Sequence, residues 1–221
     1  MDETTRNGIV KSARATRNRM TSVNIAGLDV FGIDANPSDL RPYLSKINRK
    51  LLRNVDTVYY GTVDFLEKEG KTGLYRDGCL YISDKNPTEI LPTILHELAH
   101  SLENLVRDEL AGRSDLVSEF TKKRVELFRR LYDAGYTRLD REKFMKTTFD
   151  PELDELLAGI DQDNLSRAAN GIFPTSYSST SIEEYVAGGF EIYYAGNNKF
   201  NLSKNCPNLY NFIKEIEGLL T

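Results

Sequence analysis

The chain contains only two histidines, His96 and His100, and they are four residues apart. Residues four apart on a helix share one face, and the apolar residues around them have the spacing of a helix buried on one side. This apolar stripe consists of Leu91, Ile94, Leu95, Leu98, Leu102 and Leu105. The pattern therefore predicts that both imidazoles project from one face of a helix packed behind a strand, and the fold must be one that can bury such a helix.

The residue that follows the first histidine is Glu97, so the segment has the pattern His-Glu-x-x-His. Two imidazoles spaced in this way can bind one Zn²⁺ at about 2.0–2.1 Å from each nitrogen. Glu97 is rotated by about 100° around the helix axis from His96, so it can reach a water bound to the metal and take its proton as a general base. The alternative is two ordinary histidines on a helix flank, which would place both histidines of the chain in this pattern by accident.

A catalytic zinc has three protein ligands and an open fourth position. The chain has no third histidine, so the third ligand must be a carboxylate, or else a Cys or a Tyr. For the same reason a Tyr or an Arg must stabilise the oxyanion of the transition state. Both requirements lead to the segment 176–191, which contains Tyr177, Glu183, Glu184 and Glu191.

Tyr177, then Glu184, then the aromatic helix end Phe190-Glu-Ile-Tyr-Tyr194 resemble the anthrax lethal factor-like zinc metallopeptidases, a gluzincin-type group that includes the Pro-Pro endopeptidases. The tail Cys206-Pro207-Asn-Leu-Tyr210-Asn-Phe212 is similar to the closing helix of that family. The resemblance covers about residues 78–105 and 176–217.

The resemblance implies that Glu184 is the third zinc ligand and that Tyr177 hydrogen-bonds the oxyanion. It also implies a supporting acid at Glu103, one turn past His100. The family usually has a second supporting acid four positions after the ligating Glu, where this chain has Gly188. Glu191 is the candidate to replace it, and the loss of such support typically costs about 10–100-fold in metal affinity or activity.

The expected elements are a few strands followed mainly by helices, which favours an α+β fold over alternating α/β. Strands are predicted over 28–34, 55–63, 74–75 and 79–83, and helices over 40–55, 87–107, 114–133, 151–157, 182–194 and 206–220. The rest of 140–181 is expected to be irregular, and Pro92 is expected only in the first turn of its helix. With the resemblance, the prediction is a zincin-like fold with a small N-terminal mixed sheet and a mostly helical C-terminal half.

The turn Arg76-Asp77-Gly78 predicts a hairpin that ends in the strand over 79–83. We expect this second strand to be the edge strand along which an extended peptide substrate pairs. Its residues are Cys79, Leu80, Tyr81, Ile82 and Ser83.

We expect a basic arm over 1–26 and one metallopeptidase domain over 27–221, with an insertion at about 108–170. The arm or the insertion would contact an assembly partner. The 29 basic and 33 acidic residues give a net charge of −4, which argues against a nucleic-acid partner. The chain has no apolar run of the length of a membrane span and no secretory signal at its start. It would therefore be intracellular, virion-associated or exported by a non-classical route, with Cys79 and Cys206 as buried free thiols.

The predicted function is that of a zinc-dependent endopeptidase, in which Glu97 is the general base for hydrolysis of a peptide or protein substrate. The alternative is a peptidase-like fold of weak or no activity that serves as a binding or assembly component of a phage particle or a toxin complex. Gly188, the insertion and the basic arm favour this alternative.

Overall fold

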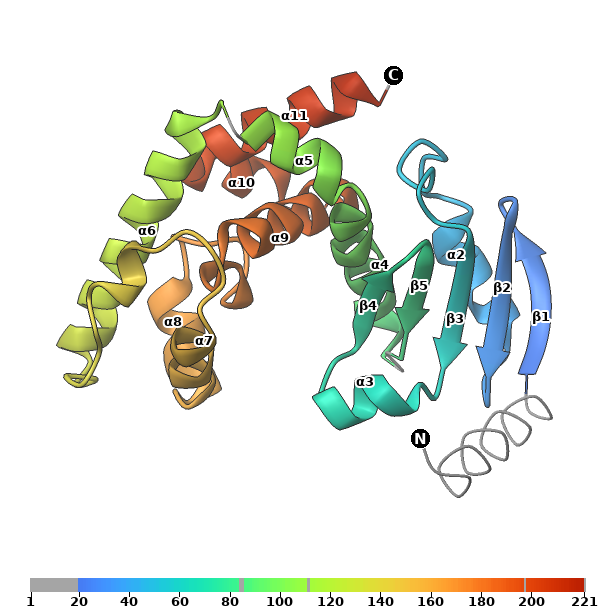
Figure 1. Cartoon of the computed structure of the whole chain (residues 1–221), viewed down its shortest axis with the longest axis horizontal. Helices are drawn as coiled ribbons and strands as arrows, with labels where there is room; N and C mark the ends of the chain where they lie inside the picture. The colour runs from blue at the N-terminus through green and yellow to red at the C-terminus, as the bar shows by residue number, and fades with distance from the viewer. Residues whose placement is uncertain (1–19, 84–85, 111, 197, 221) are drawn as a thin grey trace, which may run out of the picture. The chain divides into compact units, whose positions relative to one another are not determined.

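The computed structural model describes residues 20–83, 86–110, 112–196 and 198–220. The predicted α+β class is confirmed, because a small mixed sheet is followed by a mostly helical remainder (Figure 1). The described residues form two compact units, one that ends at Ser101 and one that begins at Leu102. We expected a single domain over 27–221, without this division.

The first unit is built on a five-stranded sheet with the order β1-β2-β3-β5-β4. Its strands are β1 (Met20–Ile25), β2 (Leu28–Ile33), β3 (Thr57–Gly61), β4 (Gly73–Arg76) and β5 (Cys79–Ile82). The central strand β3 is parallel to β2 and to β5, whereas β1 and β4 pair antiparallel at the two edges. The four predicted strands are therefore confirmed.

Both hairpins of this sheet turn through two residues with positive φ. These are Ala26 (54°) and Gly27 (85°) between β1 and β2, and Asp77 (49°) and Gly78 (79°) between β4 and β5. Two-residue turns of this kind match the twist of the flanking strands. The predicted Arg76-Asp77-Gly78 turn thus closes the second hairpin.

The prediction of Cys79 to Ser83 as the edge strand is wrong. Strand β5 pairs with β3 on one side and with β4 on the other, so β4 is the edge. The apolar content of the hairpin explains this order, because Leu80 and Ile82 of β5 are fully buried. Strand β4 has a glycine and an exposed arginine at its ends, and such a strand is better suited to an edge.

Two further predictions for this unit need correction. Strand β1 begins at Met20, inside the expected arm over 1–26, while residues 1–19 lie outside the described part of the chain. In place of a helix over 40–55 the structure has the short helices η1 (Pro37–Leu40) and α2 (Arg41–Leu44), followed by turns. The side chain of Asn48 accepts a hydrogen bond of 3.0 Å from the Lys50 N–H, a local bond that competes with a helix.

Helix α3 (Asp64–Glu69) precedes β4, and helix α4 (Pro87–Ser101) covers one face of the sheet at β4 and β5. That face carries Val30, Val58 and Leu80, which lie side by side in register and are fully buried. Pro92 lies inside α4, not in its first turn. It removes the hydrogen bond to the Thr88 carbonyl, and Thr88 is exposed, so that water can replace the bond.

The second unit is helical. Its elements are α5 (Glu103–Leu110), α6 (Ser114–Asp133), η2 (Lys143–Met145), α7 (Pro151–Ala158), α8 (Gln162–Ala169), η3 (Tyr177–Ser179), α9 (Ile182–Ala195), α10 (Lys199–Asn205) and α11 (Pro207–Leu219). The predictions for α6, α7, α9 and α11 are confirmed. The helix predicted to continue to 107 ends at Ser101, and α8 and α10 were not predicted.

Helix α9 contacts α6, α10 and α11 and is buried on most of its surface. Its glycines allow this close packing. A Cβ added to Gly189 would lie 2.7 Å from Leu209 Cδ2 and 2.9 Å from Ile213 Cδ1 of α11. The second unit thus encloses the helix that carries Glu184.

The two cysteines and the absence of a membrane span were further expectations. Cys79 and Cys206 are both free thiols, and Cys206 is buried whereas Cys79 is half-buried. Within the described ranges, no helix has both the length and the apolar character needed to cross a membrane.

Candidate metal centre

Helix α4 brings the two imidazoles together. The Nε2 atoms of His96 and His100 are 3.3 Å apart, and both side chains are half-buried. Two nitrogens bound to one tetrahedral zinc at the usual distance of about 2.0–2.1 Å would be separated by about 3.3 Å. The geometry of this helical turn therefore fits two ligands of one ion.

Glu97 lies between α4 and the edge strand β4. It is only 9% exposed, and its Oε2 accepts a hydrogen bond of 2.8 Å from the main-chain N–H of Tyr75. A buried carboxylate needs such a partner, because an unpaired one is costly to desolvate. The side chain that the sequence predicts to be the general base is thus fixed against the sheet.

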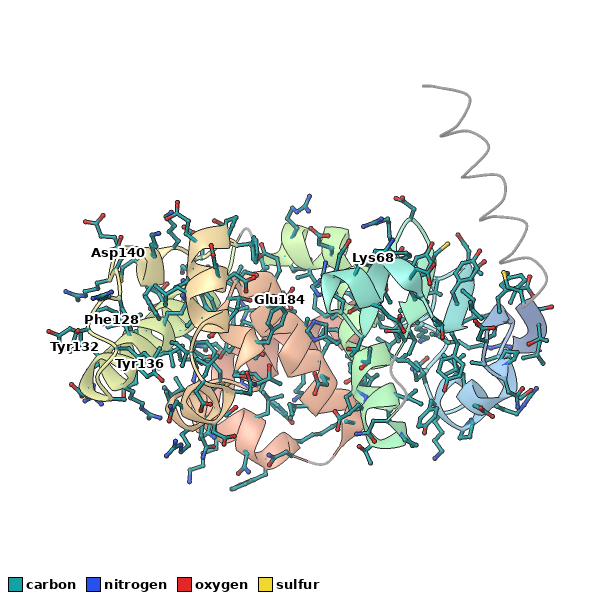
Figure 2. All side chains as sticks on the ribbon, turned by 90° about the horizontal axis from the view of Figure 1, so that it is seen from below. Lys68, Phe128, Tyr132, Tyr136, Asp140 and Glu184 are labelled. Atoms are coloured by element: carbon teal, nitrogen blue, oxygen red, sulfur yellow. The ribbon has the colours of Figure 1, made fainter. Side chains whose placement is uncertain are left out.

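Glu184 lies in the first turn of α9 (Figure 2). The Ser181 side chain caps this helix by accepting a hydrogen bond of 3.2 Å from the Glu184 N–H. Ser181 and Glu184 have the spacing of a capping box, in which a Ser or Thr N-cap is followed three residues later by Glu or Gln. The sequence around Glu184 therefore sets the start of the helix and, with it, the place of this carboxylate in the second unit.

His96, His100 and Glu184 form a group that could hold a metal ion, since each offers one ligand atom and these atoms lie within 4.8 Å of one another. Among the residues that the structure describes, no other group of three or more His, Cys, Asp or Glu side chains meets this criterion. Two imidazole nitrogens and one carboxylate oxygen are donors that zinc accepts, and a set of three leaves a fourth position open. The donor set could thus hold a metal ion with one position left open.

Tyr177 begins the short helix η3 and is 47% exposed. Its carbonyl accepts hydrogen bonds from the Thr180 N–H (3.0 Å) and the Thr180 hydroxyl (2.9 Å). The main chain of Tyr177 is thus fixed while its phenol reaches the surface.

Gly188 lies where the resemblance predicts a supporting acid, and the packing around it explains the glycine. A Cβ added there would lie 2.0 Å from the Ser178 hydroxyl oxygen, which in turn hydrogen-bonds the Thr175 hydroxyl at 2.8 Å. Helix η3 therefore packs directly on α9 at this glycine, and no acid can occupy the position without displacing the Ser178 side chain. The two segments that carry Tyr177 and Glu184 meet at this contact.

Arg124 of α6 bonds the turn between η3 and α9. It is fully buried, and its guanidinium donates to the carbonyls of Thr180 (3.2 Å) and Lys143 (2.7 Å). Burial lowers the pKa of Arg124 to about 10, and the charge of Asp150 partly offsets this. Arg124 thus remains a cation at neutral pH and ties the turn after Tyr177 to α6. No motif in the sequence pointed to it.

Three further acids differ in their surroundings. Glu191 is half-buried on α9, and Glu103 is exposed and forms an ion pair with Arg107. Burial raises the pKa of Asp154 on α7, and the charge of Glu184 raises it further. Asp154 is therefore close enough to Glu184 for their charges to interact, and the sequence analysis missed it. The supporting roles of Glu103 and Glu191 stay predictions.

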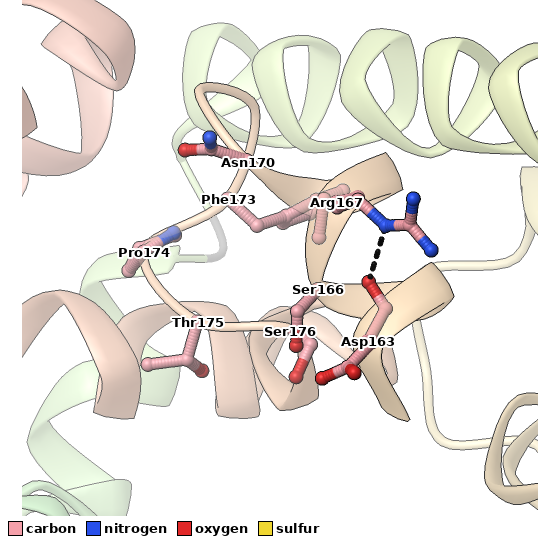
Figure 3. Close-up of a pocket in the computed structure, with 9 residues that line it drawn as sticks. Asp163, Ser166, Arg167, Asn170, Phe173, Pro174, Thr175 and Ser176 are labelled. Atoms are coloured by element: carbon pink, nitrogen blue, oxygen red, sulfur yellow. Dashed lines mark hydrogen bonds between the residues drawn. The ribbon is translucent and has the colours of Figure 1, made fainter. Parts of the chain in front are cut away.

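An open hollow of about 850 Å³ lies between α8 and the segment that leads to Tyr177 (Figure 3). Its polar lining includes Arg167, Asn170, Thr175 and Ser176, and Phe173 adds an apolar surface. Arg167 Nε donates to the Asp163 carbonyl at 3.2 Å. The hollow offers hydrogen-bonding groups beside Tyr177, and it lies within the expected insertion and the segment just after it.

The sequence pattern thus identified the group that could hold a metal ion, whereas Arg124 and Asp154 act on residues far apart from them in the chain. Ser178 and Gly188 are closer in sequence, but no short motif marks their contact. The likeness to the lethal factor-like peptidases rests on the quoted residues alone. Comparisons of this chain with protein-family models, with curated proteins and with solved structures find no match.

Proposed function

We propose that the protein is a zinc-dependent endopeptidase, with His96, His100 and Glu184 as the metal ligands. The observation that carries the proposal is the group of two imidazole nitrogens and one carboxylate oxygen within 4.8 Å of one another. The separation of 3.3 Å between the two Nε2 atoms supports it. The zincin-like fold and the family resemblance belong to the same proposal.

A bound zinc ion would lower the pKa of a water towards about 7 and polarise the peptide carbonyl. Glu97 accepts the proton of the attacking water and later donates it to the leaving amine. The Tyr177 hydroxyl donates a hydrogen bond to the oxyanion. The overall reaction is hydrolysis, in which one peptide bond and one water molecule give a carboxylic acid and an amine.

The substrate of this proposal is a peptide or a protein. The hollow, whose lining ends at Ser176 next to Tyr177, offers charged and neutral hydrogen-bonding groups and one aromatic ring, which suit a peptide segment. Since β4 and not β5 is the edge, main-chain pairing of the substrate with the sheet would involve groups of β4 other than the Tyr75 N–H, which already bonds Glu97.

The test compares wild type with Glu97→Gln on a peptide library, with the zinc content of both proteins measured by elemental analysis. We expect cleavage to stop in the variant while the zinc content stays near one per chain. Glu89→Gln is the matched control, because this exposed glutamate lies in the first turn of the same helix, and it should cleave like wild type. Cleavage by purified Glu97→Gln protein would contradict the role of the base.

One observation favours the alternative of an assembly component. Tyr132, Met145 and Phe149 are about half exposed within the expected insertion, and Tyr132 stacks on Phe128 (Figure 2). Helix α6, which carries Tyr132, contacts η2, which carries Met145, and exposed apolar patches are typical of protein contact sites. If the purified protein binds no zinc and shows no chelator-sensitive cleavage, the assembly role replaces the peptidase.

A further inference from the structure

The edge strand β4 and helix α4 meet at an unusually close contact. Gly73 lies opposite Ile82 in the ladder and Tyr75 lies opposite Leu80. Both β4 residues are next to the Glu97 side chain, as the hydrogen bond from the Tyr75 N–H and the surroundings of Gly73 show. Strand and base belong to the same compact unit.

The direction of the Tyr75 N–H follows from the hairpin. The two-residue turn makes Arg76 and Cys79 a hydrogen-bonded pair, and such pairs alternate with non-bonded pairs along an antiparallel ladder. The main-chain groups of Tyr75 therefore point away from β5, towards the edge of the sheet. The Tyr75 N–H is directed at the Oε2 of Glu97 and not at another strand.

The approach of Glu97 to this N–H requires a glycine at position 73. A Cβ added to Gly73 would lie 2.6 Å from Thr93 Cγ2, 2.9 Å from Glu97 Cγ and 3.0 Å from Glu97 Oε1. Carbon atoms do not approach within 3.0 Å of each other without strain, so an alanine would push Glu97 or the whole turn of α4 away. Gly73 has ordinary strand geometry, and its small size is therefore what this site uses.

We propose that Gly73 and the main-chain N–H of Tyr75 position the general base, by holding Oε2 of Glu97 on the edge strand so that Oε1 carries out the proton transfer. This inference rests on the proposed function. In the reaction, Oε1 takes the proton as the water oxygen bonds to the carbonyl carbon, and it returns the proton to the amine nitrogen as the carbon–nitrogen bond breaks.

Strand β4 holds the Glu97 side chain in place before a substrate binds. A glutamate side chain that is free to rotate must be ordered in each turnover, whereas one that is already held is in place for the reaction. Misplacement of a reacting group by about 1 Å can cost about 10²-fold in rate. The contact should therefore affect kcat and leave the affinities for metal and substrate unchanged.

The first test is Gly73→Ala in the full-length zinc protein. We expect kcat to fall by about 10–100-fold, while KM and zinc affinity change by less than about threefold. Gly112→Ala is the matched control, because a Cβ at Gly112 meets nothing within 4 Å, and it should keep the wild-type kcat. A wild-type kcat in Gly73→Ala would overturn the proposal.

A second variant separates the base from the helix. Thr93→Ser removes the Cγ2 atom that collides most closely with an alanine at 73 but leaves the collision with Glu97. The double variant Gly73→Ala/Thr93→Ser should therefore stay as slow as Gly73→Ala. If it regains the wild-type kcat, displacement of α4 is the cause and the proposed role of Glu97 fails.

The third measurement does not depend on activity. Hydrogen exchange of the Tyr75 amide in the metal-free protein should be slow in wild type and at least tenfold faster in Glu97→Ala. Unchanged exchange would show that Glu97 does not hold this N–H, even if the protein is a peptidase. Faster exchange in a protein that cleaves nothing would keep the contact and reject the proposed function.

Discussion

Helices α4 and α9 each carry part of the candidate metal site, but they hold their ligands in different ways. In α4 the helical repeat alone brings the Nε2 atoms of His96 and His100 to 3.3 Å. In α9 the position of Glu184 depends on the Ser181 cap and on the packing of η3 against Gly188. The two imidazoles are placed by the geometry of one helix, whereas the place of Glu184 also depends on how the segment before α9 packs on this helix.

This difference predicts where the site is vulnerable. Substitutions on other elements should leave the two imidazoles in place as long as α4 is helical. Substitutions on α6 or in η3 should move Glu184 or Tyr177, because Arg124 and Ser178 support those segments. Variants that disturb the surroundings of α9 should therefore differ in metal affinity from variants elsewhere that leave α4 intact.

The largest effects are expected from the ligands themselves. His100→Ala and Glu184→Ala should each weaken zinc binding by more than the about 10–100-fold that loss of a supporting hydrogen bond costs, because each removes one of only three donors. Competition with a chelating dye measures this affinity. Glu183→Ala is the control beside Glu184 and should bind zinc like wild type. Wild-type zinc affinity in Glu184→Ala would show that α9 supplies no ligand and would contradict the contrast between α4 and α9.

The same contrast explains what could be predicted from the sequence. The spacing of His96 and His100, the length of α6 and the Asp77-Gly78 turn are local signals, and the structure confirms them. The edge position of β4 depends on how the hairpin joins β3, which the hairpin sequence does not encode. The support by Arg124 joins segments far apart in the chain, and no short pattern marks such a residue.

The next largest effect is expected from Arg124→Met. It leaves the carbonyls of Thr180 and Lys143 without their donor, and each buried unpaired group costs about 1–3 kcal/mol. We expect the free energy of unfolding to fall by about 2–5 kcal/mol and zinc affinity to fall about tenfold. Urea denaturation measures the free energy of unfolding, and dye competition measures the zinc affinity.

Arg129→Met on the same helix is the control. It removes only exposed ion pairs, and its free energy of unfolding should stay within about 0.5 kcal/mol of wild type. An unchanged zinc affinity in Arg124→Met would limit this residue to a structural role.

A smaller effect separates the two neighbouring glycines of α9. Gly188→Ala and Gly189→Ala should each destabilise the protein by about 1–3 kcal/mol, because both add a methyl group to a packed site. Only Gly188→Ala presses on η3 through Ser178, so only this variant should lower kcat by displacing Tyr177. Thermal unfolding and steady-state kinetics compare them. Ser178→Gly in the Gly188→Ala background should restore activity, and equal kcat values in the two single variants would contradict the coupling of η3 to α9.

The smallest effect concerns the charge next to Arg124. Asp150 caps α7 by accepting hydrogen bonds from the Glu152 and Leu153 N–H groups, and Lys146 also bonds it. The hydrogen bond from Lys146, followed by the one from the Leu153 N–H, lowers the pKa of Asp150 below its usual 3.8. The unfolded chain therefore binds the proton more tightly, so this carboxylate stabilises the fold at neutral pH and the contribution is lost as the pH falls through 3.8 and below.

Asp150→Asn keeps the cap but not the charge, so its urea midpoint should be lower than that of wild type at pH 7 and should approach the wild-type midpoint in acid. The Ser181 cap of α9 has no charge, and a variant that lacks it should show a deficit that does not change over the same pH range. A constant difference between Asp150→Asn and wild type would show that the charge of Asp150 adds nothing to the support of the second unit.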